Sequence, residues 1–219
     1  MIKYIFKDGI KRDIAIGKLV CLARSYKKHA KEMKSDIPKE PVIFLKPASS
    51  VIFNAGKIKI PKMSKSIHHE VELGVVIRRK CKNISKKDAM NYVLGYLVAL
   101  DITARDIQSG FKKKGWPWTI AKSFDTFAPI SDVVLKEKVR NPQNLDICLK
   151  VNGKVRQNSN TRFMIFSIEE IIEFISKVMT LEPGDLILTG TPEGVSEILK
   201  GDVLEANLGN ICFLKVNVD

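Results

Sequence analysis

The chain has 219 residues, 45% hydrophobic and 28% charged, a composition that excludes disordered and fibrous proteins. A chain of this length buries one sizeable core, and nothing in it requires a second domain. The formal net charge of +13 would suit a nucleic-acid partner, but the lysines are scattered and residues 112–114 form the only lysine triplet. We therefore expect a solvated basic surface and no nucleic acid, with a basic nucleic-acid-binding module as the distant alternative.

The hydrophobic pattern predicts neither a membrane span nor a signal peptide. No stretch approaches the roughly 18 uncharged apolar residues that a span needs, and residues 1–8 lack a signal-peptide layout. We expect no membrane partner and a cytoplasmic location, or the mitochondrial matrix if a presequence is missing. The cysteines are far apart, show no metal-site spacing and are expected to be reduced core thiols: Cys21, Cys81, Cys148 and Cys212.

The first predicted helix covers residues 26–33 and carries His29 and Glu32. Residues three apart share a helix face, so Glu32 can orient one ring nitrogen of His29 and leave the other to activate a water. The alternative is a solvated salt pair on a lysine-rich helix.

A strand at residues 42–45 precedes the most informative segment, the predicted strand at residues 71–77. Side chains alternate along a strand, so Glu70 and Glu72 share one face, with Cα atoms about 6.5 Å apart. Two carboxylates at this spacing can converge on one hard cation. The alternative is a half-exposed strand with ordinary surface glutamates.

A third carboxylate follows the next strand. A helical pattern at residues 86–92 leads to a predicted strand at residues 96–100, and Asp101 stands where that strand ends. Three carboxylates with open positions suit Mg²⁺ or Mn²⁺, which take oxygen ligands. The alternative role for Asp101 is the N-cap of the helical pattern at residues 104–111.

Lys122 has an unusually apolar neighbourhood that includes Trp116 and Trp118. A cation held there would stabilise a developing enolate or carboxylate. The alternatives are a lysine stem lying over the tryptophans, or a weak nucleic-acid patch.

The C-terminal third is rich in strands bounded by turn signals. Asn152-Gly153 predicts a tight hairpin, and Ser167 with Glu170 predicts a capping box at the start of a helix over residues 167–179. The strand before Gly190 and Thr191 ends in small residues that can present N–H groups and a hydroxyl to a carboxylate, or form a plain turn. Strands are predicted at residues 146–151, 185–188 and 211–218.

Strands and long helices do not alternate in this pattern, so a doubly wound parallel sheet is not expected. The sequence predicts an α+β, strand-dominated fold with short helices at the margins.

Taken together, the motifs resemble the fumarylacetoacetate hydrolase superfamily from about residue 19 to the C-terminus. The size is most similar to the single-domain acylpyruvase and oxaloacetate decarboxylase branch. Family members usually read Gly-Arg-Asn-Tyr where this chain has Ala23-Arg24-Ser25-Tyr26. The matching segments are residues 21–26 with His29 and Glu32, then 44–47, 69–73, 101–108, 113–118, 122–129, 184–185 and 189–195.

The resemblance implies a mixed β-roll or sandwich of the type found in the C-terminal domain of these enzymes. Residues 1–18 would form a short N-terminal extension packed on a catalytic domain of residues 19–219. It also implies a homodimer, a small 2-oxo acid substrate, and Mg²⁺ or Mn²⁺ held by Glu70, Glu72 and Asp101.

The resemblance assigns roles to further residues. His29, Glu32, Lys122 and Gln108 would be catalytic. The residues expected to bind substrate are Arg24, Tyr26, Lys46, Arg105, Gly190 and Thr191.

The implied reaction is metal-dependent hydrolysis of the C–C bond of acylpyruvates such as acetylpyruvate or fumarylpyruvate, decarboxylation of oxaloacetate, or both. Each passes through a pyruvate enolate. The alternative is an isomerase or tautomerase of 2-hydroxy-dienedioates or oxaloacetate on the same site. An inactive scaffold is disfavoured, because three converging acids would repel one another without a cation.

Overall fold

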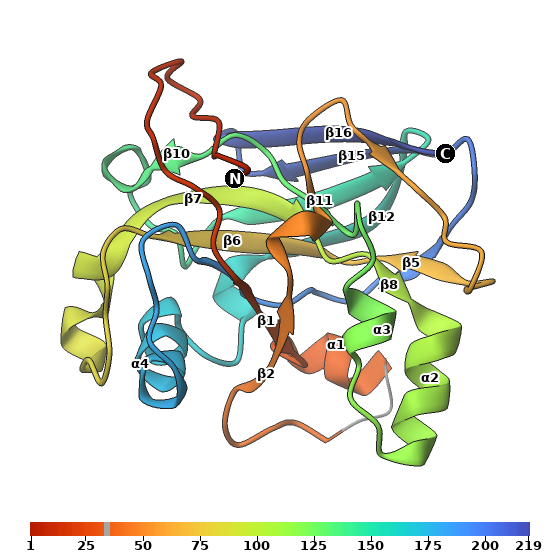
Figure 1. Ribbon diagram of the computed structural model, residues 1–219, viewed down its shortest axis with the longest axis horizontal. Coiled ribbons are helices and arrows are strands. Elements are labelled where there is room, and N and C mark those ends of the chain that lie inside the picture. The colour runs from red at the N-terminus through yellow and green to blue at the C-terminus, as the bar shows by residue number, and fades with distance from the viewer. Residues whose placement is uncertain (33–35) are drawn as a thin grey trace.

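The structure is a computed structural model that describes residues 1–32 and 36–219 (Figure 1). Met33, where the first predicted helix ends, lies outside the described residues. Strands dominate and the helices are short, so the predicted α+β class is confirmed. Within the described ranges, no helix is long and apolar enough to cross a membrane.

The largest sheet has six strands: β1 (Leu19–Ala23), β2 (Val42–Lys46), β6 (Val71–Ile77), β7 (Val93–Leu100), β10 (Val134–Leu135) and β13 (Leu186–Leu188). Their order is β10-β7-β6-β13-β1-β2. β1 runs parallel to β13, and the other neighbouring pairs are antiparallel. The sheet is therefore mixed and not doubly wound, as predicted. β1 was not predicted as a strand, although the run from Leu19 to Leu22 is apolar.

The second sheet has five strands: β4 (Lys57–Ile58), β11 (Asp146–Val151), β12 (Lys154–Asn160), β15 (Val203–Leu208) and β16 (Cys212–Val218). Their order is β12-β11-β15-β16-β4. Asn152 and Gly153 join β11 to β12 with φ values of 51° and 75°. Two consecutive left-handed residues give a turn whose twist matches the strands, so the predicted hairpin is confirmed.

Two small sheets complete the strands. β5 (Ile67–His69) lies between β8 (Thr103–Ala104) and β14 (Ser196–Ile198), and β3 (Val51–Ile52) pairs with β9 (Ala128–Pro129).

The helices lie at the margins of the sheets (Figure 1). α4 begins with the predicted capping box, in which Ser167 Oγ accepts from Glu170 N and Glu170 Oε2 accepts from Ser167 N. The α-helices are α1 (Lys27–Glu32), α2 (Arg105–Lys114), α3 (Thr119–Lys122) and α4 (Ile168–Val178), and the 3₁₀ helices are η1 (Ala48–Ser50), η2 (Lys86–Tyr92), η3 (Lys136–Lys138) and η4 (Thr161–Phe163).

Both faces of β6 are buried. Val71, Leu73 and Val75 belong to the main core, which also contains side chains of the five-stranded sheet and α4. Val76 points to the opposite face, into a second core that includes Tyr4 and other residues near the N-terminus. The predicted alternation of β6 is present, but its glutamate-bearing face is covered by protein and not exposed to solvent.

Candidate active site

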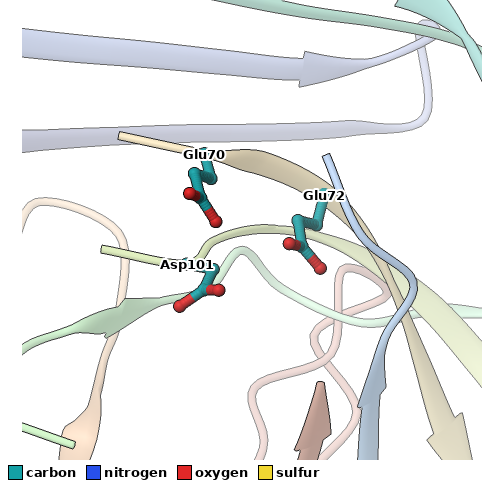
Figure 2. A group of neighbouring side chains, drawn as sticks. All are labelled: Glu70, Glu72 and Asp101. Carbon is teal, nitrogen blue, oxygen red and sulfur yellow. The ribbon is translucent and has the colours of Figure 1, made fainter. Parts of the chain in front are cut away.

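Three carboxylates meet where β6 begins and β7 ends. The two strands are antiparallel with Val71 opposite Leu100, and Asp101 N donates to Glu70 O at 2.8 Å. This pairing places Asp101 beside Glu70, and Glu72 joins them from β6. One oxygen from each carboxylate lies within 4.8 Å of the others, and the three groups point toward a common space (Figure 2).

All three carboxylates are buried: Glu70 is 5% exposed, and Glu72 and Asp101 are 0% exposed. The interpretation of Glu70 and Glu72 as surface glutamates is therefore wrong. The N-cap alternative for Asp101 is also wrong, because the residue at the N-cap of α2 is Ala104.

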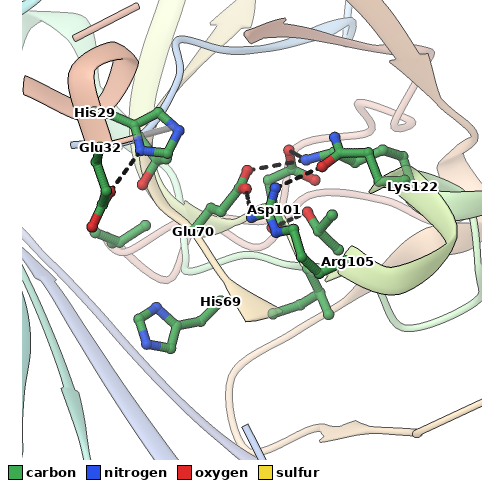
Figure 3. Close-up of polar contacts among 12 residues, drawn as sticks. His29, Glu32, His69, Glu70, Asp101, Arg105 and Lys122 are labelled. Carbon is green, nitrogen blue, oxygen red and sulfur yellow. Dashed lines mark hydrogen bonds and ion pairs between the residues drawn. The ribbon is translucent and has the colours of Figure 1, made fainter. Parts of the chain in front are cut away.

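Three buried or nearly buried cations surround two of these acids, and Figure 3 shows two of them, Lys122 and Arg105. Lys122 Nζ contacts Asp101 Oδ2 and lies 3.0 Å from Glu70 Oε2. Lys46 Nζ lies 2.6 Å from Asp101 Oδ1, and Arg105 pairs with Glu70 Oε1. We expected the three acids to repel one another unless a metal ion compensated their charges. This expectation needs correction, because side-chain cations already offset the negative charges of Glu70 and Asp101. The alternative in which the Lys122 stem lies over the tryptophans and its ammonium reaches solvent is wrong, because Lys122 is only 2% exposed and its Nζ contacts Glu70 and Asp101.

Glu72 contacts none of these cations. Its Oε2 accepts from Gly190 N at 2.7 Å, and its Oε1 is buried without a hydrogen-bond partner in the described part of the chain. Burial raises the pKa of Glu72 well above its usual range, and the charges of Asp101 and Glu70 raise it further. A cation bound beside Glu72 would therefore stabilise its ionised form.

The pKa of Glu70 moves the opposite way. Burial alone would raise it, but Lys122 and Arg105 outweigh burial and hold the pKa of Glu70 well below its usual range. The cluster thus combines one ionised carboxylate, Glu70, with a second, Glu72, that has no cationic partner among the described residues. Oxygen ligands with a free, buried lone pair fit a divalent metal ion, so the residues present suit such a group.

His29 and Glu32 form the predicted pair on α1 (Figure 3). Nδ1 of His29 donates to Glu32 Oε2 at 3.1 Å, and Gly194 N donates to Glu32 Oε1 at 3.0 Å. His29 is only 7% exposed whereas Glu32 is exposed, so the solvated-pair alternative holds for the carboxylate and not for the imidazole. Among the residues that the structure describes, Nε2 of His29 has no hydrogen-bond partner, and this nitrogen is free to act on a substrate.

One pocket brings most of the predicted residues together. It holds about 430 Å³ of empty space, the open mouth included. Its lining includes the catalytic candidates His29, Gln108 and Lys122, the acids Glu70 and Glu72, and the substrate-binding candidates Arg24, Arg105 and Thr191.

Other predicted residues act from outside the lining. Lys46 is 1% exposed and donates to the carbonyls of Ile102 at 3.0 Å and Lys122 at 2.5 Å, behind the acid cluster. Tyr26 is buried and borders a separate hollow with Ser159. The structure therefore does not bring Lys46 or Tyr26 to the pocket surface.

Gly190 has a structural reason to be glycine. Its φ is +91°, and a Cβ there would meet Oγ of Ser25. Arg24, the residue before Ser25, also has a left-handed φ of 58°, a conformation that non-glycine residues rarely adopt. The segment with Ala23 and Ser25 thus packs directly against the turn that binds Glu72.

Several residues of this site were not predicted, among them Phe44, Gln157 and Lys112. Phe44 lines the pocket, and its ring centroid lies 4.8 Å from Lys122 Nζ. Gln157, 0% exposed, donates to Thr191 Oγ1 at 2.8 Å. Lys112 also lines the pocket, and its spacing from Arg105 and Gln108 is the sequence signal that would have found it.

Comparison with known proteins gives a consistent family. The family described as fumarylacetoacetate (FAA) hydrolase C-terminal matches residues 18–219. A relative from Arabidopsis thaliana, named mitochondrial oxaloacetate tautomerase FAHD1, is 48% identical over 219 residues, which is 100% of this chain and 95% of the relative.

Two solved structures share the fold and differ in reaction. Fumarylpyruvate hydrolase from Pseudomonas aeruginosa in complex with Mn²⁺ and pyruvate has a TM-score of 0.94 at 33% identity, over 98% of this chain and 94% of that one. 5-Carboxymethyl-2-hydroxymuconate delta-isomerase from Mycobacterium smegmatis has a TM-score of 0.84 at 38% identity, over 94% of this chain and 79% of that one. With its sequence match and its fold in agreement, this chain belongs to the fumarylacetoacetate hydrolase family.

Proposed function

We propose that this chain is a divalent-metal enzyme that interconverts the keto and enol forms of oxaloacetate. The observation that carries the proposal is the buried contact of Lys122 with Glu70 and Asp101, which holds a cation where an enolate would form. Hydrolysis came first among the reactions expected from the sequence. We reverse that order because the relative from Arabidopsis thaliana is named an oxaloacetate tautomerase.

Glu70, Glu72 and Asp101 would hold the ion, which we propose to be Mg²⁺ or Mn²⁺. Both ions prefer oxygen ligands, and the similar fumarylpyruvate hydrolase contains Mn²⁺ together with pyruvate. When bound, such an ion supplies a Lewis acid that polarises the 2-oxo group of the substrate.

The proton would be moved by His29. With Nδ1 donating to Glu32, Nε2 carries the lone pair, so it would take the proton from C3 of the keto form and pass it to the 2-oxygen to give the enol. In the reverse direction it would take the proton from the enol O–H and return it to C3. Glu32 is a positioning residue, held by Gly194 N. Lys122 would offset the negative charge on the enolate oxygen, and Gln108, fixed by Arg105 Nη1 at 2.6 Å, would orient the distal end of the substrate.

Hydrolysis of acylpyruvates is the second candidate, and the His29–Glu32 pair favours it specifically. An unengaged Nε2 can activate a water for attack on the distal carbonyl, after which pyruvate leaves as its enolate. Decarboxylation of oxaloacetate would give the same enolate with no water attack. Tautomerisation passes through the enolate of oxaloacetate itself, so a site that stabilises the enolate of a 2-oxo acid suits all three reactions.

The experiment follows the enol absorbance of oxaloacetate with purified protein and Mg²⁺, Mn²⁺ or EDTA. Pyruvate release is measured in parallel from acetylpyruvate, fumarylpyruvate and oxaloacetate, with protein-free metal as the blank. Metal-dependent loss of enol without pyruvate supports tautomerisation, and pyruvate from an acylpyruvate supports hydrolysis. If no substrate changes faster than in the blank, the proposal fails.

Three further expectations remain proposals. We propose a homodimer, which light scattering on the eluting protein would test, and no nucleic-acid partner, which a binding assay at low salt would test. The proposed location is cytoplasmic, with the mitochondrial matrix as the alternative suggested by the relative named mitochondrial.

A further inference from the structure

Two cations line the pocket without an acidic partner. Arg24 is half-buried, Lys112 is exposed at the mouth, and across residues 1–32 and 36–219 neither forms an ion pair with a carboxylate. The other lining cations, Arg105 and Lys122, are both paired with Glu70. The outer part of the pocket therefore carries positive charge that the protein itself does not neutralise.

Helix α2 connects the acid cluster to the mouth. Arg105, Gln108 and Lys112 stand at positions i, i+3 and i+7, which lie on one helix face, and all three line the pocket. A helix rises 1.5 Å per residue, so the Cα of Lys112 lies about 10 Å along the axis from that of Arg105. Arg105 contacts Glu70 at the inner end, and Lys112 reaches a different part of any bound molecule.

Lys112 is held in place and crowded by like charge. Its Nζ lies 5.3 Å from the ring centroid of Trp118, a cation–π contact that keeps the ammonium at the mouth. Although Lys112 is exposed as a residue, partial desolvation of its ammonium against the pocket wall lowers its pKa, and the nearby charges of Arg105 and Arg24 lower it further against the opposing charge of Glu70. An anion bound between Lys112 and Arg24 would relieve this repulsion.

Arg24 is fixed by its backbone. Its φ of 58° lies in the left-handed region, and the next residue, Ser25, is 1% exposed and packs against Gly190. Strained residues of this kind persist where the surrounding structure holds them, and they cluster at binding sites. The guanidinium therefore reaches the pocket from a rigid segment.

We propose that Arg24 and Lys112 form a second anion site that selects 2-oxo acids carrying a second carboxylate over monocarboxylic ones. The proposal rests on the proposed function in one respect, namely that the 2-oxo acid end of the substrate occupies the acid cluster. Arginine and lysine both recognise carboxylates, Arg24 through its fork of N–H donors and Lys112 as a point charge.

The test compares equilibrium binding of two unreactive ligands with the same chain length. 2-Oxoglutarate carries a terminal carboxylate, and 2-oxopentanoate has a methyl group there. Calorimetric titration with Mg²⁺ present is expected to give at least tenfold tighter binding of 2-oxoglutarate. Lys112→Met should remove most of this preference and leave the affinity for 2-oxopentanoate unchanged, whereas Lys112→Arg should retain the preference.

Lys113→Met is the matched control. Lys113 is the exposed neighbour that does not line the pocket, and its replacement lowers the net charge by the same amount. The preference should survive in this variant, and loss of the preference there would show a general charge effect and overturn the proposal. Equal binding of the two ligands by the unaltered protein, or an equal loss of both in Lys112→Met, would overturn it as well.

The enol assay separates this proposal from the proposed function. Metal-dependent enol loss together with equal binding of the two ligands leaves the function standing and removes the second anion site. Binding of neither ligand overturns the second anion site, and enol loss then shows whether the function falls with it.

Discussion

The backbone N–H of Gly190 donates to Oε2 of Glu72 at 2.7 Å, so the turn after β13 positions a carboxylate that lies 118 residues earlier in the chain. The turn can approach this closely because Gly190 has no side chain and its φ is +91°. The geometry of the acid cluster thus depends on a backbone position as well as on three acidic residues.

Gly190→Ala should damage both stability and metal binding. A Cβ at this φ costs about 1 kcal/mol in backbone strain, and here it also meets Ser25 Oγ, so we expect a total loss of about 2 kcal/mol or more. The turn must shift away from Glu72, and the Mn²⁺ affinity should fall by at least about tenfold. Chemical denaturation and calorimetric titration measure the two effects.

Gly201→Ala is the control for this substitution. Gly201 also has a φ of +91°, but no atom lies within 4 Å of a Cβ built there. The Gly201→Ala variant should lose about 1 kcal/mol of unfolding free energy, because of backbone strain alone, and should keep its metal affinity. Equal effects of the two substitutions on metal affinity would contradict the role given to Gly190.

Glu70→Gln and Glu72→Gln should differ in the metal-free protein. Glu70 offsets Lys122 and Arg105, so its replacement leaves buried cations uncompensated and should cost about 3 kcal/mol. Within residues 1–32 and 36–219 Glu72 has no cationic partner, and a neutral amide there can still accept from Gly190 N. Glu72→Gln should therefore leave the free energy of unfolding in EDTA unchanged or raise it.

Both substitutions should still weaken metal binding. Residues that only support metal ligands contribute factors of 10 to 100, so loss of a ligand should cost at least about 100-fold in affinity. Denaturation in EDTA measures the effect on stability without metal, and titration with Mn²⁺ measures the effect on metal affinity. Strong destabilisation by Glu72→Gln without metal would contradict this prediction, because it would show that another group compensates the charge of Glu72 in the metal-free protein.

His29→Asn should separate the reactions that need a base from the one that does not. A positioned general base contributes about 10² to 10⁴ in rate, so tautomerisation and hydrolysis should fall by about 100-fold or more. Decarboxylation of oxaloacetate and Mn²⁺ affinity should change little, since His29 is not among the three acids. Unaltered tautomerisation in His29→Asn would assign the proton transfer to another group.

The capping box of α4 gives a pH-dependent contribution far from the pocket. The hydrogen bond from Lys86 and that from Ser167 N hold the pKa of Glu170 below its usual value. A carboxyl with a lowered folded-state pKa stabilises the fold above the unfolded pKa of about 4.3, and this stability is lost as the pH falls through the folded value. The difference in unfolding free energy between the unaltered protein and Glu170→Gln should thus shrink from pH 6 to pH 3.

Ser167→Ala tests the other half of the box. Removing an N-cap hydroxyl should cost about 1 kcal/mol, because Glu170 N loses its acceptor. Activity should be unchanged in both variants. A pH-independent difference for Glu170→Gln would show that its charge makes no contribution.

The elements predicted best are those whose cause is local. The hairpin at Asn152 and Gly153 and the capping box at Ser167 each depend on a few adjacent residues, and both are present. The hairpin implied a strand after Gly153, but the extent of β12 was not predicted, because its sequence is polar and it pairs at the edge of a sheet, where burial imposes no pattern. The 3₁₀ character of η2 was not predicted, because the helical pattern at residues 86–92 does not distinguish an α-helix from a 3₁₀ helix.

The sequence by itself determined the alternation along β6, the order of the motifs and the identity of the three acids. The tertiary structure alone decided that both faces of β6 are buried and that Lys46, Lys122 and Arg105 offset Glu70 and Asp101. It also decided that Gly190 N is the one hydrogen-bond partner of the Glu72 carboxylate in the described part of the chain. The physical reason is distance. Backbone preference acts between neighbours in sequence, whereas charge compensation and burial depend on through-space contacts between residues that lie tens to more than a hundred positions apart.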